Sequence, residues 1–248
     1  MPYVEHPVFA QPPAEEATVW RYMELAKFVL LLEHNALYFP RADLLGDPHE
    51  GALPAANAAA RGALISETEE KSGQEWIWAP GIDPAEPTKI HLSQTFVSCW
   101  NLSDHEDTLL WYAYGKGIAV RSTYAALRGS FRCDEPVYIG CVRYIDYRSD
   151  SFPADNTFQA IVHKRRFFEG EHELRAVIPG RTLNEETLRW EPDPREGIYA
   201  AVNIEQLIHG VHVAPGETTL REAVAAICNR FGLEAVAHQS SLDDPPTY

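Results

Sequence analysis

Short apolar runs recur along the chain and are separated by polar residues, glycine and proline. Residues 18–23 are typical of a strand, residues 24–35 have the spacing of an amphipathic helix, and residues 36–39 predict a second strand. The same criteria predict strands at 94–100, 117–123 and 136–147, helices at 105–115 and 154–171, two strands within 197–215, a helix at 218–232 and a strand at 233–240.

The order of these elements predicts the fold class. Helices interrupt the strands without a regular strand–helix–strand repeat, so we expect an α+β fold, a single domain with a mixed, largely antiparallel sheet and flanking helices. Residues 1–17 contain four prolines and predict an extended N-terminal arm. Residues 18–248 then form the domain, with an insertion at about 47–90 that combines an alanine-rich helix with a loop around Trp76 and Trp78.

The charge of the chain limits its partners. It carries 21 basic and 36 acidic residues, a formal net charge of −15. Proteins bind duplex nucleic acid mainly by neutralising phosphates, so this charge argues against an extended duplex-binding surface. The longest apolar run is far shorter than the roughly 20 residues of a membrane span, so no membrane partner is expected. The four cysteines form no C-x-x-C pair and follow no signal peptide, which indicates the cytoplasm.

Residues 167–177, FFEGEHELRAV, place three glutamates and an arginine beside an apolar run. As a helix, the segment would pair Glu171 with Arg175 but set Glu169 against Glu173. As a strand, it would put Glu171, Glu173 and Arg175 on one face, with the carboxylates roughly 6 to 7 Å apart. The apolar residues that follow favour the strand. Such a face has about even odds of being a solvent-exposed row of weak ion pairs or a functional site. In a functional site, Arg175 would keep the carboxylates ionised.

Several segments resemble a bacterial family catalogued as a domain of unknown function, number 2971. They are WRYM, LYFPRADLLGDPHEG, FVSCWNLSDHEDTLLWYAYG, GIAVRST, VRYIDY and KRRFFEGEHELRAV, and they cover most of the chain between residues 19 and 177. Gly46 stands where that family usually has an asparagine before D-P-x-E. The resemblance implies membership of the family but brings no known activity with it.

The chain is also distantly similar to ADP-ribosyltransferases of the arginine-serine-glutamate type. Those enzymes carry an arginine on the first core strand, a Ser-Thr element on a later strand and E-x-E on a last strand. Arg21, Ser122-Thr123 and Glu171-His172-Glu173 occur here in that order, although Tyr124 follows the Ser-Thr element. The resemblance implies an enzyme that cleaves NAD, by transfer or hydrolysis of ADP-ribose, and a role as a toxin or anti-phage defence component.

The same resemblance implies roles for particular residues. Glu173 would stabilise the oxocarbenium-like transition state, and Glu171 would orient or deprotonate the acceptor, a protein or a nucleic acid. Arg21 would clamp a phosphate of NAD with its planar fork of donors. The full set expected to bind NAD is Arg21, Trp111, Tyr114, Ser122, Arg175 and Lys164. Trp111 or Tyr114 would stack on nicotinamide, although aromatic residues three apart on a helix are more often core residues.

Other interpretations remain open from the residues themselves. Arg21 is equally consistent with an ion pair to Asp47 or Glu50 at a strand end. Asp47, His49 and Glu50, together with the two glutamates and Lys164, would suit a metal-dependent nuclease or phosphoesterase, although an Asp-Pro more often forms a capped turn. We therefore predict no bound metal. A third alternative is a non-catalytic module in which the N-terminal arm and residues 75–78 meet a protein partner.

Overall fold

A seven-stranded sheet organises the computed structural model, which describes residues 2–72, 86–115, 117–153, 155–180, 183–184, 189–233 and 236–247. The strand order is β13–β12–β4–β1–β3–β8–β5, and β12 and β13 pair in parallel while the other neighbours are antiparallel. These strands are β1 (Thr18–Met23), β3 (Thr95–Leu102), β4 (Ile118–Thr123), β5 (Tyr138–Cys141), β8 (Glu173–Pro179), β12 (Gly210–Val213) and β13 (Ala237–Gln239).

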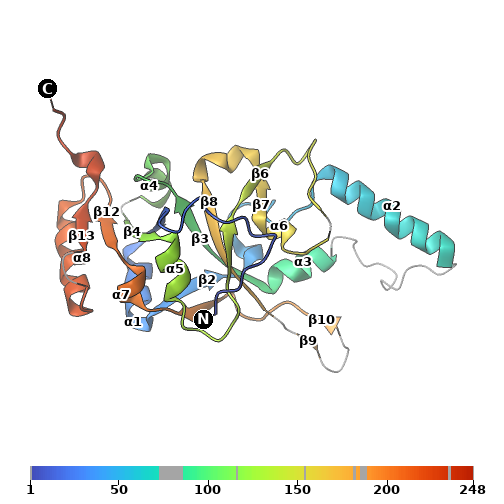
Figure 1. The fold of residues 1–248 in the computed structure, drawn as a ribbon, viewed down its shortest axis with the longest axis horizontal. Coiled ribbons are helices and arrows are strands. Elements are labelled where there is room, and N and C mark those ends of the chain that lie inside the picture. The colour runs from blue at the N-terminus through green and yellow to red at the C-terminus, as the bar shows by residue number, and fades with distance from the viewer. Residues whose placement is uncertain are drawn as a thin grey trace.

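Three two-stranded sheets and a set of helices complete the architecture (Figure 1). The small sheets pair β2 (Ala36–Pro40) with β11 (Gly197–Ala201), β6 (Arg143–Ile145) with β7 (His163–Arg165), and β9 (Leu183–Asn184) with β10 (Arg189–Trp190). The helices are α1 (Leu25–His34), α2 (Ala55–Ser72), α3 (Glu86–Ser93), α4 (Thr108–Tyr114), α5 (Tyr124–Ser130), α6 (Gln159–Val162), α7 (Ile204–Leu207) and α8 (Thr218–Arg230), with 3₁₀ turns η1 (Ala42–Leu44), η2 (Arg166–Glu171) and η3 (Ser241–Asp243). The predicted α+β fold with a mixed, mostly antiparallel sheet is confirmed.

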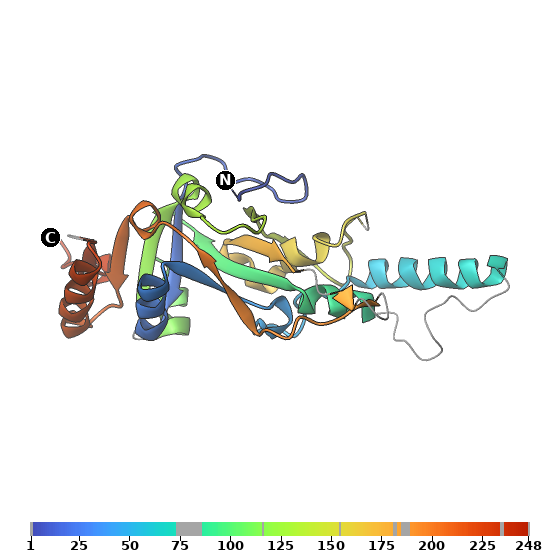
Figure 2. The ribbon, with the colours of Figure 1, turned by 90° about the horizontal axis from the view of Figure 1, so that it is seen from below.

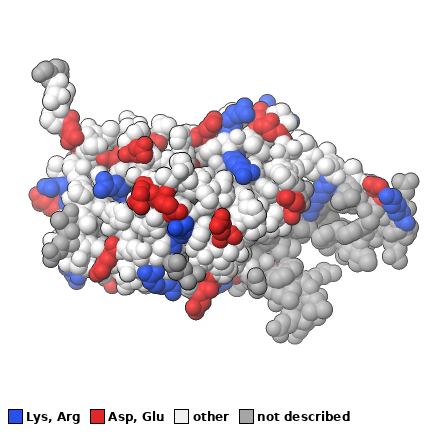
Figure 3. All heavy atoms as spheres, viewed as in Figure 1, with Lys and Arg blue, Asp and Glu red and all other residues white. Residues whose placement is uncertain are grey.

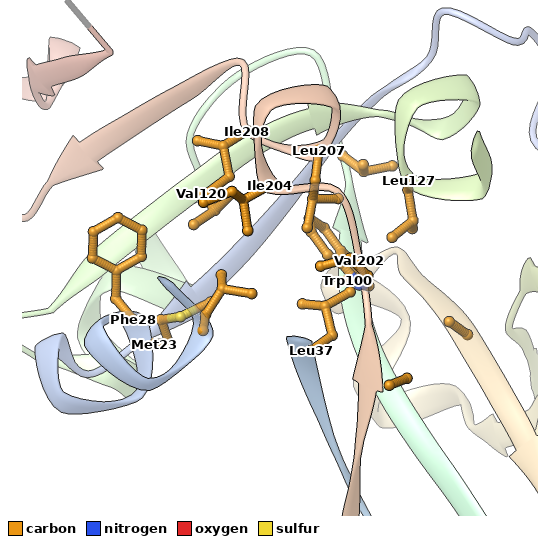
Figure 4. Close-up of a cluster of buried hydrophobic side chains, with 14 of the residues drawn as sticks. Met23, Phe28, Leu37, Trp100, Val120, Leu127, Val202, Ile204, Leu207 and Ile208 are labelled. Carbon is orange, nitrogen blue, oxygen red and sulfur yellow. The ribbon is translucent and has the colours of Figure 1, made fainter. Parts of the chain in front are cut away.

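One face of the large sheet carries the main hydrophobic core. Side chains from alternate positions of β1, β3, β4 and β8 pack there against α1, α5, α7, α8 and the β2–β11 pair. Figure 4 shows Phe28 of α1, Leu127 of α5 and Leu207 of α7 converging on Trp100 and Val120 of the sheet. Because a strand alternates its side chains between two faces, this core fixes which residues of each strand face the other way.

The opposite face carries two smaller apolar clusters with a gap between them. One cluster joins Val97 and Val177 of the sheet to α6 and to Phe9 of the N-terminal segment. The other joins Trp20 and Tyr22 of β1 to Trp111 of α4. Polar side chains of β3 and β8 therefore lie between two apolar walls, and this is where the candidate site forms.

Local signals explain why α4 begins and ends where it does. The Asp107 carboxylate accepts hydrogen bonds from the N–H groups of Leu109 and Leu110, at 2.7 and 3.2 Å, and so caps the helix. Gly115 ends it with φ at +61°. The helix consequently holds one face toward β1 and exposes Tyr112 to solvent.

Two sequence-based predictions of long elements were wrong. The predicted strand at 136–147 is divided into β5 and β6, because the Val142 N–H bonds the Glu173 carbonyl and the chain then changes partner from β8 to β7. The predicted helix at 154–171 contains only the four-residue α6 before it becomes β7 and η2, since β7 pairs with β6. The two strands expected within 197–215 are β11 and β12, with α7 between them.

Only part of the region predicted as an insertion, 47–90, leaves the body of the domain, because Asp47 and Glu50 belong to it and pair with Arg165 and Arg175. Helix α2 projects from it as a rod in both ribbon views, at the opposite end from α8 (Figure 2). The loop around Trp76 and Trp78 lies outside the described residues. Within the described part, no helix is long and apolar enough to cross a membrane.

Candidate functional site

The candidate site is a cleft of about 460 Å³ on the second face of the sheet. Its floor is a row across three neighbouring strands, in which Trp20 of β1 pairs with Asn101 of β3 and Asn101 pairs with Glu173 of β8. Residues that are direct partners in a sheet project to the same face. The β8 face therefore points Glu173 and Arg175 into the gap between the two smaller apolar clusters.

Arg175 is the centre of a buried ion network. Its Nε and Nη2 donate to the two oxygens of Glu173 at 2.9 and 3.0 Å, and its Nη1 and Nη2 donate to the two oxygens of Glu50 at 3.0 and 2.9 Å. Nη1 also donates to the Ile161 carbonyl at 2.6 Å. Arg175 is only 1% exposed, so these bonds replace the water that a guanidinium would otherwise hold. The network joins β8, β7, α6 and the segment before α2.

Lys164 of β7 adds a second cation. Its ammonium lies 2.6 Å from Glu171 Oε2, 3.3 Å from Glu173 Oε2 and 3.4 Å from Glu50 Oε1. Burial alone would lower the pKa of Lys164, but the surrounding carboxylates raise it above its ordinary value. Lys164 therefore stays charged and holds three glutamates together.

The network keeps Glu173 ionised. Burial alone would raise the pKa of Glu173, but the charges of Arg175 and Lys164 and hydrogen bonds from Arg175 and Cys99 lower it to about 2. The Glu173 N–H donates to the Tyr144 hydroxyl at 2.8 Å, which fixes the start of β8. The Glu173 side chain is only 6% exposed, and Arg175 and Lys164 both bond its oxygens. Glu173 therefore acts as a buried group that holds these two cations in position.

Glu171 is the carboxylate that a ligand reaches most directly. It lies on η2, and its side chain is 36% exposed. His172 follows with φ at +43°, and the Asn101 side chain donates to the Glu171 carbonyl at 2.7 Å. Because of this turn, Glu171 is not on the strand that was predicted to carry it, yet it lines the same cleft as Glu173. One oxygen of Glu171 contacts Lys164, and no hydrogen bond joins the other oxygen to a described residue.

Aromatic rings and a third cation form the walls. Trp20, Tyr22, Tyr114 and Phe168 all line the cleft. Arg165 also lines it and binds Asp47 through two hydrogen bonds, at 2.7 and 3.3 Å. Burial would raise the pKa of Asp47, but bonds from the His49 N–H and Arg165 lower it. Asp47, Glu50, Glu171 and Glu173 face Lys164, Arg165 and Arg175, so the cleft keeps one formal negative charge.

Five of the eight predicted site residues come together. They are Glu171, Glu173, Lys164, Arg175 and Tyr114. Trp111 and Ser122 lie outside the cleft lining: Trp111 is 5% exposed and donates its Nε1–H to Glu106 at 2.9 Å, and Ser122 is buried on β4, where its hydroxyl donates to the Thr123 carbonyl. The prediction that Trp111 and Tyr114 share one cleft was therefore wrong. Both rings contact Tyr22, but Trp111 packs in the buried cluster behind it and only Tyr114 lines the cleft.

Arg21 lies on the other face of the sheet. It alternates with Trp20 and Tyr22 on β1, and its guanidinium donates to Ser98 Oγ and to the Tyr38 carbonyl and sits 5.8 Å above the Trp100 ring. The expectation that Arg21 and Glu173 line one cleft was therefore wrong. The ion pair to Asp47 or Glu50 that we considered for Arg21 is not formed either, because those acids bind Arg165 and Arg175.

Sequence reasoning missed the aromatic walls and Arg165 as site residues. Trp20 and Tyr22 flank Arg21 on a predicted strand, so period-two alternation gave the signal that they face away from it. The Arg165–Asp47 pair joins segments far apart in the chain, and no local pattern predicts it. Gly51 also matters, because it has φ at +66° and an added Cβ would lie 2.2 Å from Leu92, so this glycine sets the turn that follows Glu50.

Among the described residues, no group of three or more histidine, cysteine, aspartate or glutamate side chains is arranged to hold a metal ion. The carboxylates of the cleft are interleaved with arginine and lysine, which bond the oxygens that a divalent cation would need. Comparisons of the chain with protein-family models, curated proteins and solved structures found no match.

Proposed function

We propose that the cleft binds NAD and cleaves its bond between ribose and nicotinamide, with Glu171 as the carboxylate that acts on the ligand. The observation that carries this proposal is the pairing of a partly exposed carboxylate, Glu171, with a buried and permanently charged neighbour, Lys164, in an aromatic-walled cleft. The predicted clamp at Arg21 has no part in it, which separates this proposal from the arginine-serine-glutamate pattern.

The parts of a nicotinamide nucleotide fit the chemistry of the lining. The nicotinamide ring would stack on Tyr114, Trp20 or Tyr22. The diphosphate would meet Arg165, whose Nε and Nη2 bind Asp47 and whose Nη1 makes no hydrogen bond to a described residue. A cleft of about 460 Å³ lies within the range of small-molecule sites. The adenosine end would extend beyond it, over the exposed Phe167.

The reaction needs negative charge at the ribose. As the C1′–N bond breaks, nicotinamide leaves with the bonding electron pair and positive charge develops on C1′ and the ring oxygen. Glu171 stabilises that charge, and water or an acceptor then adds to C1′ and gives its proton to Glu171. Glu173 does not take part directly, because Arg175 and Lys164 bond its oxygens. Its role is to hold Lys164 and Arg175 in position.

The test measures nicotinamide release from NAD by chromatography. It compares wild-type protein with the Glu171→Gln and Glu169→Gln variants. Glu169 is an exposed glutamate on the same turn and does not line the cleft, so it is a matched control. We expect Glu171→Gln to slow release by roughly 100- to 1,000-fold, the size typical of one lost electrostatic contact in a transition state, and Glu169→Gln to leave it unchanged. Absence of release by folded wild-type protein would reject the proposal.

A second candidate is phosphoester hydrolysis. It is favoured by one observation, that Asp47, Glu50, Glu171, Glu173 and Lys164 all line the same cleft, as a nuclease or phosphoesterase would require. It is weakened by the arginine and lysine bonds to those carboxylates. Cleavage of bis(4-nitrophenyl) phosphate that requires Mg²⁺ or Mn²⁺ and disappears in Glu171→Gln would favour this candidate over NAD cleavage.

A further inference from the structure

A second cavity of about 470 Å³ lies away from the cleft. Residues of the first turns of α2 and of the helix α3 line it, together with Phe152, residues 155–157 and Ala160. None of the residues that line it belongs to the lining of the cleft. The second cavity is therefore separate from the cleft.

Hydrogen bonds hold the wall of this cavity in place. The Asn57 side chain donates to the Phe152 carbonyl at 2.7 Å and accepts from the Phe152 N–H at 3.1 Å, so it pins both backbone groups of a residue far away in sequence. Asn156 accepts from the Phe158 N–H at 2.8 Å and lies 3.3 Å from the His6 ring. These bonds hold Phe152 and Asn156 in place, so this part of the wall needs no ligand to order it.

Two opposite charges line the cavity, and neither has an ionic partner among the described residues. Arg61 donates from Nη1 to the Thr88 hydroxyl at 3.0 Å, and within the described part of the chain it pairs with no carboxylate. Asp155 accepts one bond, from the Gln159 side chain at 3.2 Å, and pairs with no cation of the described residues. Each keeps hydrogen-bonding capacity for a group of the opposite charge.

Apolar side chains complete the lining. Leu53, Ala60, Phe152 and Ala160 contribute to it, and the cavity is lined more by apolar than by polar surface. A ligand that satisfies all of these features carries an anionic group for Arg61, a cationic group for Asp155 and an apolar part for the remaining wall.

We infer that the second cavity binds a small zwitterion with an apolar side chain, of the chemical class of free hydrophobic amino acids. The carboxylate of the ligand meets Arg61, its ammonium group meets Asp155, and its side chain packs near Phe152. The inference does not depend on NAD cleavage, since it uses none of the residues of the cleft.

The experiment is isothermal titration of the full chain with L-phenylalanine and L-leucine. Two analogues separate the charges: 3-phenylpropionate lacks the ammonium group and 2-phenylethylamine lacks the carboxylate. We expect wild-type protein to bind an amino acid at about millimolar concentration or below, and to bind both analogues at least about tenfold more weakly, because each lacks one charged hydrogen bond.

Variants then assign the contacts. Arg61→Gln and Asp155→Asn should each weaken amino-acid binding about tenfold or more, with Arg61→Gln sparing 2-phenylethylamine and Asp155→Asn sparing 3-phenylpropionate. Ala60→Trp, which keeps both charges but fills the cavity, should weaken the binding of all four ligands. Arg221→Gln, on the exposed side of α8, is the control that should leave the binding of every ligand unchanged. The proposal is overturned if neither amino acid binds wild-type protein, or if binding survives in both charge variants that circular dichroism finds folded.

Discussion

Glu173 and Arg175 lie two residues apart on β8 and face the same side of the sheet, where two arginine nitrogens donate to the two carboxylate oxygens at 2.9 and 3.0 Å. The same guanidinium binds both oxygens of Glu50. One cation thus holds two buried anions, and the stability of this region depends on it.

Loss of Arg175 is expected to destabilise the protein strongly. Arg175→Met leaves Glu50 and Glu173, both 6% exposed, without their main counter-charge, and removal of one partner from a buried ion network costs about 3–5 kcal/mol. The measurement is the free energy of unfolding in urea. Arg128→Met is the matched control, because the side chains of its pair with Glu15 are 34% and 55% exposed and pairs open to solvent contribute about 1 kcal/mol or less. Similar losses in the two variants would contradict the buried network.

Glu173 is expected to make stability depend on pH. Its pKa is lowered to about 2 in the folded chain from an ordinary value of 4.5, so the unfolded chain takes up the proton first as the pH falls. The contribution is fully present above about pH 4.5 and is lost as the pH falls toward about 2; it amounts to roughly 3 kcal/mol. Urea titrations over this range should therefore give a shallower loss of stability in acid for Glu173→Gln than for wild-type protein. The exposed Glu5→Gln variant should follow wild type.

Tyr114 and Trp111 are expected to respond differently to truncation. Tyr114 lines the cleft and is 44% exposed, whereas Trp111 is 5% exposed and its Nε1–H bonds Glu106. Trp111→Ala should cost about 3–5 kcal/mol of unfolding free energy as a large core truncation, while Tyr114→Ala should cost much less and should raise the KM for NAD. Thermal unfolding and steady-state kinetics on the same preparations distinguish the two. An unchanged KM in Tyr114→Ala would remove the proposed ring contact.

Arg21 is expected to matter for folding and not for NAD cleavage. Arg21→Met removes bonds to Ser98 and Tyr38 on the face away from the cleft, and the lost hydrogen bonds of a charged group should cost about 1–3 kcal/mol. The rate of nicotinamide release per folded molecule should stay at the wild-type value. A large loss of activity in a variant of near-normal stability would show that Arg21 reaches the ligand after all.

Elements with strong local signals were predictable from the sequence. Strand β1, helix α1 and helix α8 follow apolar periodicity, and β8 follows the apolar run after Glu173. The stretch 163–171 was not predictable, because His163–Arg165 becomes a strand only by pairing with β6. Its residues have the composition of a helix, and a partner far along the chain decides otherwise.

For the candidate site, the types of residue around Glu173 correctly predicted which side chains lie together. The order of motifs along the chain led to wrong predictions. Five charged residues of the stretch 164–175 do meet in one cleft with Tyr114: Lys164, Arg165, Glu171, Glu173 and Arg175. Arg21 and Ser122 were chosen for their order along the chain, and order does not specify the face of a sheet. Alternation does: Trp20 and Tyr22 face the cleft because Arg21 faces away.

Very short lengths of backbone connect the cleft to the second cavity. Glu50 of the ion network is followed by Leu53 of the second cavity, and Ala160 of that cavity is followed by Lys164 of the network. Arg175 also donates a hydrogen bond to the carbonyl of Ile161, which lies between Ala160 and Lys164. A molecule that binds in the second cavity and displaces either stretch would alter the affinity of the cleft for its ligand. Thermodynamic reciprocity requires a ligand in the cleft to alter affinity at the second cavity by the same factor.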